Sequence, residues 1–200
     1  MTAGARALFR LDAGPAIGLG HAMRCLALAG ELKRRGWAVR FATNPGARAP
    51  LEAIAPDAAA SVDIVEAEGL EEPERLGALA PEGCDVLVVD HYGCDAQAES
   101  AWRSFAPRIA VIDDLADRPH DADLLIDTTY GRAAADYAAL LPAHARVVTG
   151  PAYALLPPRF AEVRPAALRR RARGGSVGAI LVTLGGAPLD FTVTDPYVGE

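Results

Sequence analysis

Short runs of apolar residues alternate along the chain with longer segments whose apolar residues lie three or four positions apart. The runs are typical of buried strands, and the spaced segments are typical of helices that pack on a sheet. The predicted strands cover residues 7–11, 37–42, 62–65, 85–90, 108–112, 123–126 and 146–149. The predicted helices cover residues 21–35, 49–54, 71–79, 96–105, 133–140 and 159–173.

This alternation predicts an α/β fold, a Rossmann-like parallel sheet with helices on both faces. Ligands of such sheets bind beyond the carboxyl ends of the strands. Polar clusters follow three of the predicted strands, and their shared position predicts a functional site at that edge. The clusters are Asp12 to His21, Asp90-His91-Tyr92 and Asp113-Asp114.

The turn after the first strand is rich in glycine. Gly14, Gly18 and Gly20 allow backbone N–H groups to approach a ligand, and the N-terminus of the next helix favours a phosphate there. His21 begins that helix, where the positive end of the helix dipole disfavours the imidazolium. We therefore expect a neutral His21 that acts as a general base, although a capping or surface histidine fits the same spacing.

Composition narrows the possible partners. The 200 residues carry a formal net charge of −6 and the basic residues are scattered, which argues against a nucleic acid partner. The chain contains no apolar run of membrane-spanning length and no cleavage-site pattern, so we expect a cytoplasmic protein without a membrane partner. Its three cysteines form no Cys-x-x-Cys pair and signal neither a disulfide framework nor a zinc site.

Six motifs occur in order along the chain. They are Arg10-x-Asp12, Ile17-Gly-x-Gly-His21-x-x-Arg24, Val89-Asp90-His91-Tyr92, Ile112-Asp113-Asp114, Gly150-Pro151-x-Tyr153-Ala154-Leu155-Leu156 and Leu184-Gly185-Gly186. Together they resemble the N-terminal half of the UDP-2,4-diacetamido-2,4,6-trideoxy-β-L-altropyranose hydrolases of pseudaminic acid biosynthesis. That family is grouped with spore-coat polysaccharide proteins and is similar in fold to MurG-like glycosyltransferases.

The resemblance implies the N-terminal half of a GT-B fold. It implies an enzyme in which water attacks the anomeric carbon with inversion and releases UDP, without a metal or other cofactor. It also implies that His21 is the general base and that Tyr92 lines the sugar site. The residues predicted to bind substrate are Arg10, Asp12, Gly18, Gly20, Arg24, Asp90, His91 and Tyr92.

Some of these roles have alternatives. Arg10 could pair with Asp12 or with substrate, and both Asp12 and Asp90 could orient a histidine, either His21 or His91, or cap turns. The N–H groups of the turn glycines, including Gly18 and Gly20, are expected to face the diphosphate.

We expect three parts in the chain. Residues 1–157 form the N-terminal Rossmann-like domain on the sugar and catalytic side, and residues 158–175 form a linker helix. Residues 176–200 hold the first strand and turn of an incomplete nucleotide-binding domain, because a strand–helix–strand unit needs about 30 residues. We therefore expect weak or no hydrolysis by this chain alone. The expected partners are the UDP-sugar and a separately encoded second domain, or a second copy bound through the exposed cleft face.

Three other functions fit parts of the sequence. In a GT-B glycosyltransferase, His21 would deprotonate an acceptor hydroxyl in place of water. An inactive truncated remnant would only bind a sugar nucleotide. A metal-dependent phosphoesterase would require metal ligands from the strand ends and from His120, which is otherwise expected to be a surface histidine. The candidate ligands are Asp90, His91, Asp113, Asp114 and His120.

Overall fold

The computed structural model describes residues 4–14 and 17–174. The strands are β1 (Arg6–Leu11), β2 (Ala38–Thr43), β3 (Asp63–Glu66), β4 (Val86–Asp90), β5 (Ile109–Ile112), β6 (Leu124–Asp127) and β7 (Arg146–Thr149). The α-helices are α1 (Gly20–Arg34), α2 (Arg48–Ile54), α3 (Pro56–Ala60), α4 (Pro73–Ala78), α5 (Ala96–Trp102) and α6 (Arg159–Ala172). Two short 3₁₀ helices are η1 (Ala134–Tyr137) and η2 (Pro151–Tyr153).

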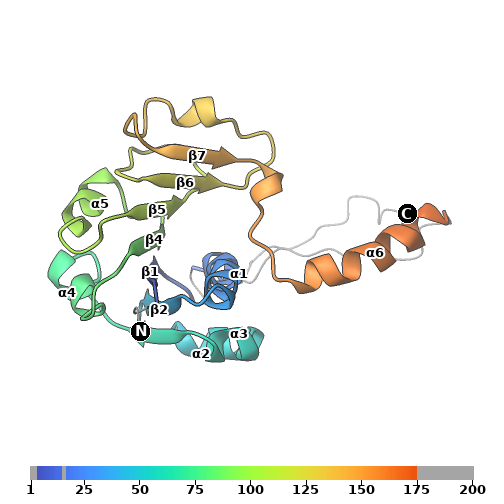
Figure 1. The fold of residues 1–200 in the computed structure, drawn as a ribbon, viewed down its shortest axis with the longest axis horizontal. Coiled ribbons are helices and arrows are strands. Elements are labelled where there is room, and N and C mark those ends of the chain that lie inside the picture. Colours follow the sequence, from blue (N-terminus) through green and yellow to red (C-terminus); the bar gives the residue numbers. More distant parts are fainter. Residues whose placement is uncertain (1–3, 15–16, 175–200) are drawn as a thin grey trace, which may run out of the picture.

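All seven strands pair in parallel in one sheet, in the order β3-β2-β1-β4-β5-β6-β7 (Figure 1). Each lies within one residue of its predicted bounds. The predicted Rossmann-like parallel sheet with helices on both faces is therefore confirmed. The strand predicted within residues 176–200 lies outside the described residues.

Two apolar cores cover the two faces of the sheet, and alternation along β1 supplies both. Phe9 and Leu11 pack with the apolar stripe of α1 and with α2 and α3. Leu8 points to the opposite face and packs with residues of α4 and α5, including Trp102. Cys25 is buried in the first core, as its place in the α1 pattern predicts.

The segment predicted as a helix over residues 133–140 is instead the 3₁₀ turn η1, which is followed by irregular chain. Tyr137 at the end of this turn is fully buried, and its hydroxyl donates to carboxylates at the ends of β5 and β6. This tertiary contact prevails over the helix propensity of the alanines around it. The short helix α3 was not predicted. Pro56 in its first turn is a residue that commonly marks the start of a helix, and it could have indicated α3.

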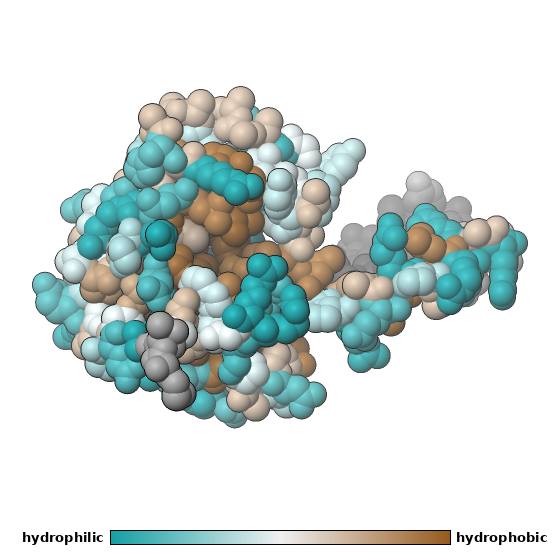
Figure 2. All heavy atoms as spheres, viewed as in Figure 1, coloured by the Kyte–Doolittle hydropathy of each residue, from teal (hydrophilic) through white to brown (hydrophobic). Residues whose placement is uncertain are grey.

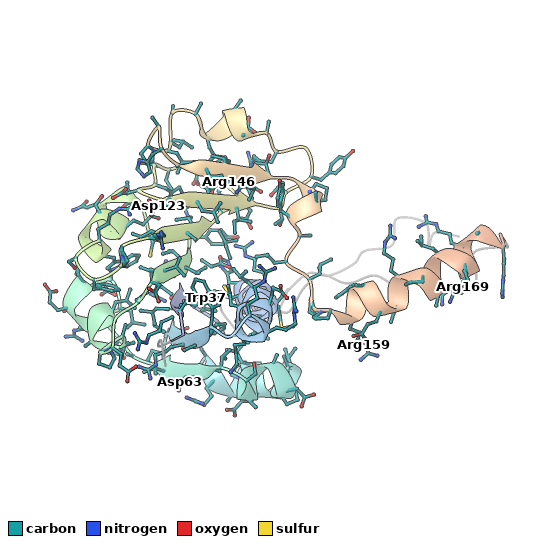
Figure 3. All side chains as sticks on the ribbon, in the orientation of Figure 1. Trp37, Asp63, Asp123, Arg146, Arg159 and Arg169 are labelled. Atoms are coloured by element: carbon teal, nitrogen blue, oxygen red, sulfur yellow. The ribbon has the colours of Figure 1, made fainter. Side chains whose placement is uncertain are left out.

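Helix α6 confirms the predicted helix after Pro158 and has no buried residue. It extends away from the sheet (Figure 1), and its surface is mostly hydrophilic (Figure 2). Arg159 and Arg169 project from it into solvent (Figure 3). Its role as a linker between domains stays a prediction, as do the predicted domain boundaries.

No helix among the described residues has the length and apolar character required to cross a membrane. The cytoplasmic location stays a prediction.

Candidate functional site

The polar clusters meet at the carboxyl edge of the sheet, as predicted. Strands β1 and β4 are neighbours, and Leu11 is in register with Asp90. The chain turns back after β1, so that His21, the second residue of α1, reaches the end of β4. Asp90 is the last residue of β4 and its side chain is fully buried there.

His21 and Asp90 form a hydrogen-bonded pair. The Nδ1 atom of His21 lies 2.6 Å from Asp90 Oδ1 and 3.2 Å from the Asp90 carbonyl oxygen. Because both neighbours accept hydrogen bonds, Nδ1 carries a proton. The Nε2 atom of His21 has no hydrogen-bond partner among the described residues. Its lone pair is therefore the basic position of the neutral ring.

Arg24 holds the other side of the same carboxylate. It lies three residues after His21, so the two side chains share one face of α1. Its Nε and Nη2 atoms donate to the two oxygens of Asp90 at 2.6 Å each, and its Nη1 atom donates to Asp114 at 2.8 Å. Burial alone would raise the pKa of Asp90, but the hydrogen bonds from Arg24 and His21 outweigh it and lower the pKa. Asp90 is therefore an ionised acceptor.

The pKa of His21 is raised from its ordinary value of 6.5. Burial alone would lower it, but the hydrogen bond and negative charge of Asp90 outweigh burial. The helix N-terminus was expected to disfavour the imidazolium, so the direction of this pKa shift is opposite to that expectation. A full charge in hydrogen-bond contact has a larger effect than the partial charge of a helix end.

A second histidine, His91, is held differently. Its Nε2 atom lies 2.9 Å from Asp12 Oδ2, and its Nδ1 atom accepts the Gly93 N–H at 3.0 Å. Both ring nitrogens are therefore occupied, and His91 has no free lone pair for a proton. Arg10 donates to the other oxygen of Asp12. In this structure Asp90 pairs with His21, Asp12 pairs with His91, and Arg10 pairs with Asp12.

Tyr92 lies beside His21. Its ring meets the His21 ring edge to face, with centroids 4.6 Å apart at 87°. The residue is 48% exposed, so much of its surface is available to a ligand. This position agrees with a sugar-lining role, which stays a prediction. The predicted substrate contacts of Arg10, Asp12, Arg24, Asp90 and His91 stay predictions as well. In the structure, Arg10 and His91 both bind Asp12, and Arg24 binds Asp90.

The glycine turn differs from the prediction in one respect. The Gly18 N–H donates to the Gly14 carbonyl at 2.7 Å, and the Gly14 N–H donates to the Gly18 carbonyl at 3.2 Å. Both residues have positive φ, which favours glycine at these positions. The Gly18 N–H is therefore hydrogen-bonded within the turn in this structure, and its predicted contact with a diphosphate stays a prediction. The Gly20 N–H, at the first residue of α1, has no backbone partner among the described residues and fits the predicted role.

Several polar residues of this edge were missed by sequence reasoning. The Tyr137 hydroxyl lies 2.8 Å from carboxylate oxygens of both Asp113 and Asp127. Arg118 pairs with Asp113, and Arg132 pairs with Asp127. No local pattern joins these residues; the only signal was that Asp113 and Asp127 follow predicted strands.

His120 is not the surface residue that we expected. It is 3% exposed, and its Nδ1 atom lies 2.8 Å from Glu99 Oε1. Asp90 and Asp113 are paired with arginines. Among the described residues, no group of three histidine, cysteine or acidic side chains could hold a metal ion. The residues suggested for a metal-dependent phosphoesterase therefore do not converge.

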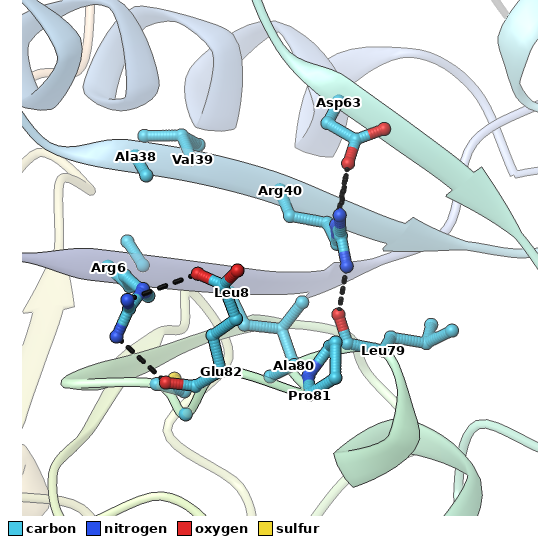
Figure 4. Close-up of a pocket in the computed structure, with 13 residues that line it drawn as sticks. Arg6, Leu8, Ala38, Val39, Arg40, Asp63, Leu79, Ala80, Pro81 and Glu82 are labelled. Carbon is cyan, nitrogen blue, oxygen red and sulfur yellow. Dashed lines mark hydrogen bonds and ion pairs between the residues drawn. The ribbon is translucent and has the colours of Figure 1, made fainter.

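A separate pocket of about 280 Å³ lies at the opposite, amino edge of the sheet (Figure 4). Arg40 crosses it to Asp63 and to the Leu79 carbonyl, and Arg6 binds the Glu82 carbonyl. Its charged groups are thus paired with each other, and it contributes nothing to the His21 site.

The paired carboxylates predict an acid-sensitive fold. The pKa values of Asp12, Asp90, Asp113 and Asp127 are all lowered below 3.8. The stabilisation that these carboxylates give the folded state is present above pH 3.8 and is lost as the pH falls through their lowered pKa values. The raised pKa of His21 has the opposite effect on the pH dependence of folding stability. The stabilisation that His21 contributes is present below pH 6.5 and is lost as the pH rises through the raised pKa. We expect the urea midpoint to fall steeply below pH 3.8; a constant midpoint there would contradict the ion pairs.

Three comparisons place the chain among known proteins. It is 30% identical over 156 residues to the UDP-2,4-diacetamido-2,4,6-trideoxy-β-L-altropyranose hydrolase of Campylobacter jejuni, an alignment that covers 78% of this chain and 53% of that protein. The chain thus spans about half the length of this curated relative. No family model matches the chain.

Among solved structures, Acinetobacter baumannii MurG matches with 14% identity and a TM-score of 0.43, over 72% of this chain and 45% of MurG. A putative short-chain alcohol dehydrogenase from Burkholderia multivorans matches with 23% identity and a TM-score of 0.35, over 57% of this chain and 65% of that protein. The sequence comparison is the informative one. It confirms the resemblance that the six motifs indicate: over most of its length, this chain is similar to a UDP-2,4-diacetamido-2,4,6-trideoxy-β-L-altropyranose hydrolase.

Proposed function

We propose that this chain carries the catalytic side of an inverting UDP-sugar hydrolase with a GT-B fold, which acts on a UDP-linked diacetamido-trideoxy sugar in pseudaminic or related nonulosonic acid biosynthesis. The substrate comes from the similarity to the Campylobacter jejuni protein. The chemistry is argued from the geometry of His21 and Asp90.

One observation carries the proposal: the buried 2.6 Å hydrogen bond between His21 Nδ1 and Asp90 Oδ1. It orients the ring, sets its tautomer and leaves Nε2 as the basic atom. An ionised acceptor also stabilises the imidazolium that forms when Nε2 takes a proton. A histidine held in this way is suited to deprotonate a bound water.

In the proposed reaction, His21 Nε2 removes a proton from water while the water oxygen bonds to the anomeric carbon. The bond between that carbon and the diphosphate oxygen breaks, and UDP leaves with the electron pair. The uncapped start of α1, including the Gly20 N–H, supports a position for the diphosphate because its donors face developing negative charge. The exposed ring of Tyr92 supports a position for the sugar.

The test is UDP release from a UDP-linked diacetamido sugar, measured with protein in excess over substrate. We expect slow release and a free sugar with an inverted anomeric carbon, because this chain spans about half of its relative. Transfer of the sugar to an added acceptor, with no release to water, would favour the glycosyltransferase. Release no faster than without protein would overturn the proposal and favour a binding remnant.

A further inference from the structure

We propose that Arg118 is a positioning residue, which holds the loop of residues 91–94 so that Tyr92 lies against His21. Its importance for turnover rests on the proposed function, whereas the placement itself does not. Arg118 belongs to none of the six motifs and lies in the loop between β5 and β6.

Arg118 forms hydrogen bonds to the backbone on both sides of Tyr92. Its Nη2 atom donates to the His91 carbonyl at 3.3 Å, and its Nε atom donates to the Cys94 carbonyl at 2.8 Å. Its Nη1 atom donates to Asp113 at 2.9 Å. One guanidinium thus joins the loop after β4 to the end of β5.

The Asp113 anchor is rigid. Asp113 is 1% exposed and also accepts the Ala116 N–H and the Tyr137 hydroxyl at 2.8 Å each. Tyr137 is fully buried in the core. Arg118 therefore ties the loop to a part of the protein that cannot shift without disturbing the core.

Among the described residues, Tyr92 makes one aromatic contact and one long side-chain hydrogen bond. Besides the edge-to-face contact with His21, its hydroxyl approaches Asp114 Oδ2 only at 3.4 Å. Its place therefore depends on the loop backbone, in which the Cys94 N–H donates to the His91 carbonyl at 3.3 Å and which has two side-chain anchors from outside the turn. His91 is bound to Asp12 on one side, and Arg118 holds the carbonyls on the other.

Lysine cannot replace this arginine. A guanidinium is a planar fork that donates in several fixed directions, whereas an ammonium is a compact point charge. In Arg118→Lys the ion pair with Asp113 can persist, but the two loop carbonyls cannot both be reached. This substitution therefore tests the hydrogen bonds to the loop carbonyls separately from the ion pair with Asp113.

The experiment uses NMR of the histidine rings. The chain has four histidines, and His21→Gln assigns the His21 signals. The Tyr92 ring shifts these signals by its ring current, and Tyr92→Leu defines the complete loss of that shift. We expect Arg118→Lys to move the His21 signals most of the way to their Tyr92→Leu positions.

The matched control is Arg103→Lys. Arg103 has a comparable set of bonds, to Asp121 through Nε and Nη2 and to Asp123 through Nη1, at the amino end of β6. Arg103→Lys should lower stability without moving the His21 signals. Unchanged His21 signals in Arg118→Lys, or an equal change in Arg103→Lys, would overturn the proposal.

The kinetic consequence is tested separately. If UDP release depends on His21, Arg118→Lys should reduce it by up to about 10²-fold, the effect of a displaced site group, while the urea midpoint changes no more than in Arg103→Lys. A shifted His21 signal with unaltered release would show that Arg118 positions Tyr92 but that turnover does not need it. If the proposed function is wrong, UDP release will instead be independent of His21.

Discussion

His21→Ala is expected to lower UDP release by about 10²–10⁴-fold, the range of a general base. Of the two histidines at this edge of the sheet, His21 has an open ring nitrogen among the described residues, whereas both nitrogens of His91 are hydrogen-bonded. Some release should remain, since an anomeric diphosphate is a good leaving group. The measurement is UDP formed over time by the wild-type chain and by the variant.

Two further variants identify the role of the ring. His144→Ala removes a largely exposed histidine and should leave release unchanged. Asp90→Asn keeps a side chain of the same shape but removes the charge that raises the pKa of His21, so this pKa should fall. In the wild type, release should increase with pH through the raised pKa, because the base must be neutral. Release by His21→Ala at the wild-type rate would rule out His21 as the base.

Glu99→Ala is expected to destabilise the fold by about 2–4 kcal/mol, the cost of leaving buried hydrogen-bonding groups without partners. The Glu99 carboxylate is fully buried and accepts from His120 Nδ1 at 2.8 Å and from the Asp121 N–H at 2.6 Å. Removing it leaves both donors inside the protein without an acceptor. His120 Nε2 already lacks a partner among the described residues. Such a loss is a large part of a typical folding stability of about 5–15 kcal/mol.

The change should appear as a lower urea midpoint with an unchanged slope. The urea midpoint of Glu99→Gln should lie between those of the wild type and Glu99→Ala. The amide oxygen can accept one hydrogen bond, but the NH₂ group cannot accept the other. Glu74→Ala, which removes an exposed glutamate from α4, should have little effect. Equal midpoints for the alanine variants at positions 99 and 74 would contradict a structural role of the buried pair.

The sequence by itself determined the architecture. The apolar runs located every strand of the described residues, because a parallel strand covered on both faces requires a continuous apolar segment. The spacing in α1 and Gly36 after it located that helix. Polar residues directly after apolar runs placed the site at the carboxyl edge of the sheet. The position of His21 after the glycine turn made it the expected base, and the resemblance supported that choice.

Only the tertiary structure decided which partner each polar residue has. His21 and Asp90 are 69 residues apart, and the sequence left Asp12 equally able to orient the ring. No pattern along the chain predicted that Arg118 binds the loop of residues 91–94 or that Tyr137 is buried. The same holds for the pairing of His120 with Glu99. The physical reason is that periodicity records whether a side chain faces the core or solvent. Contacts between loops depend on strand order and register, which arise only when the sheet assembles.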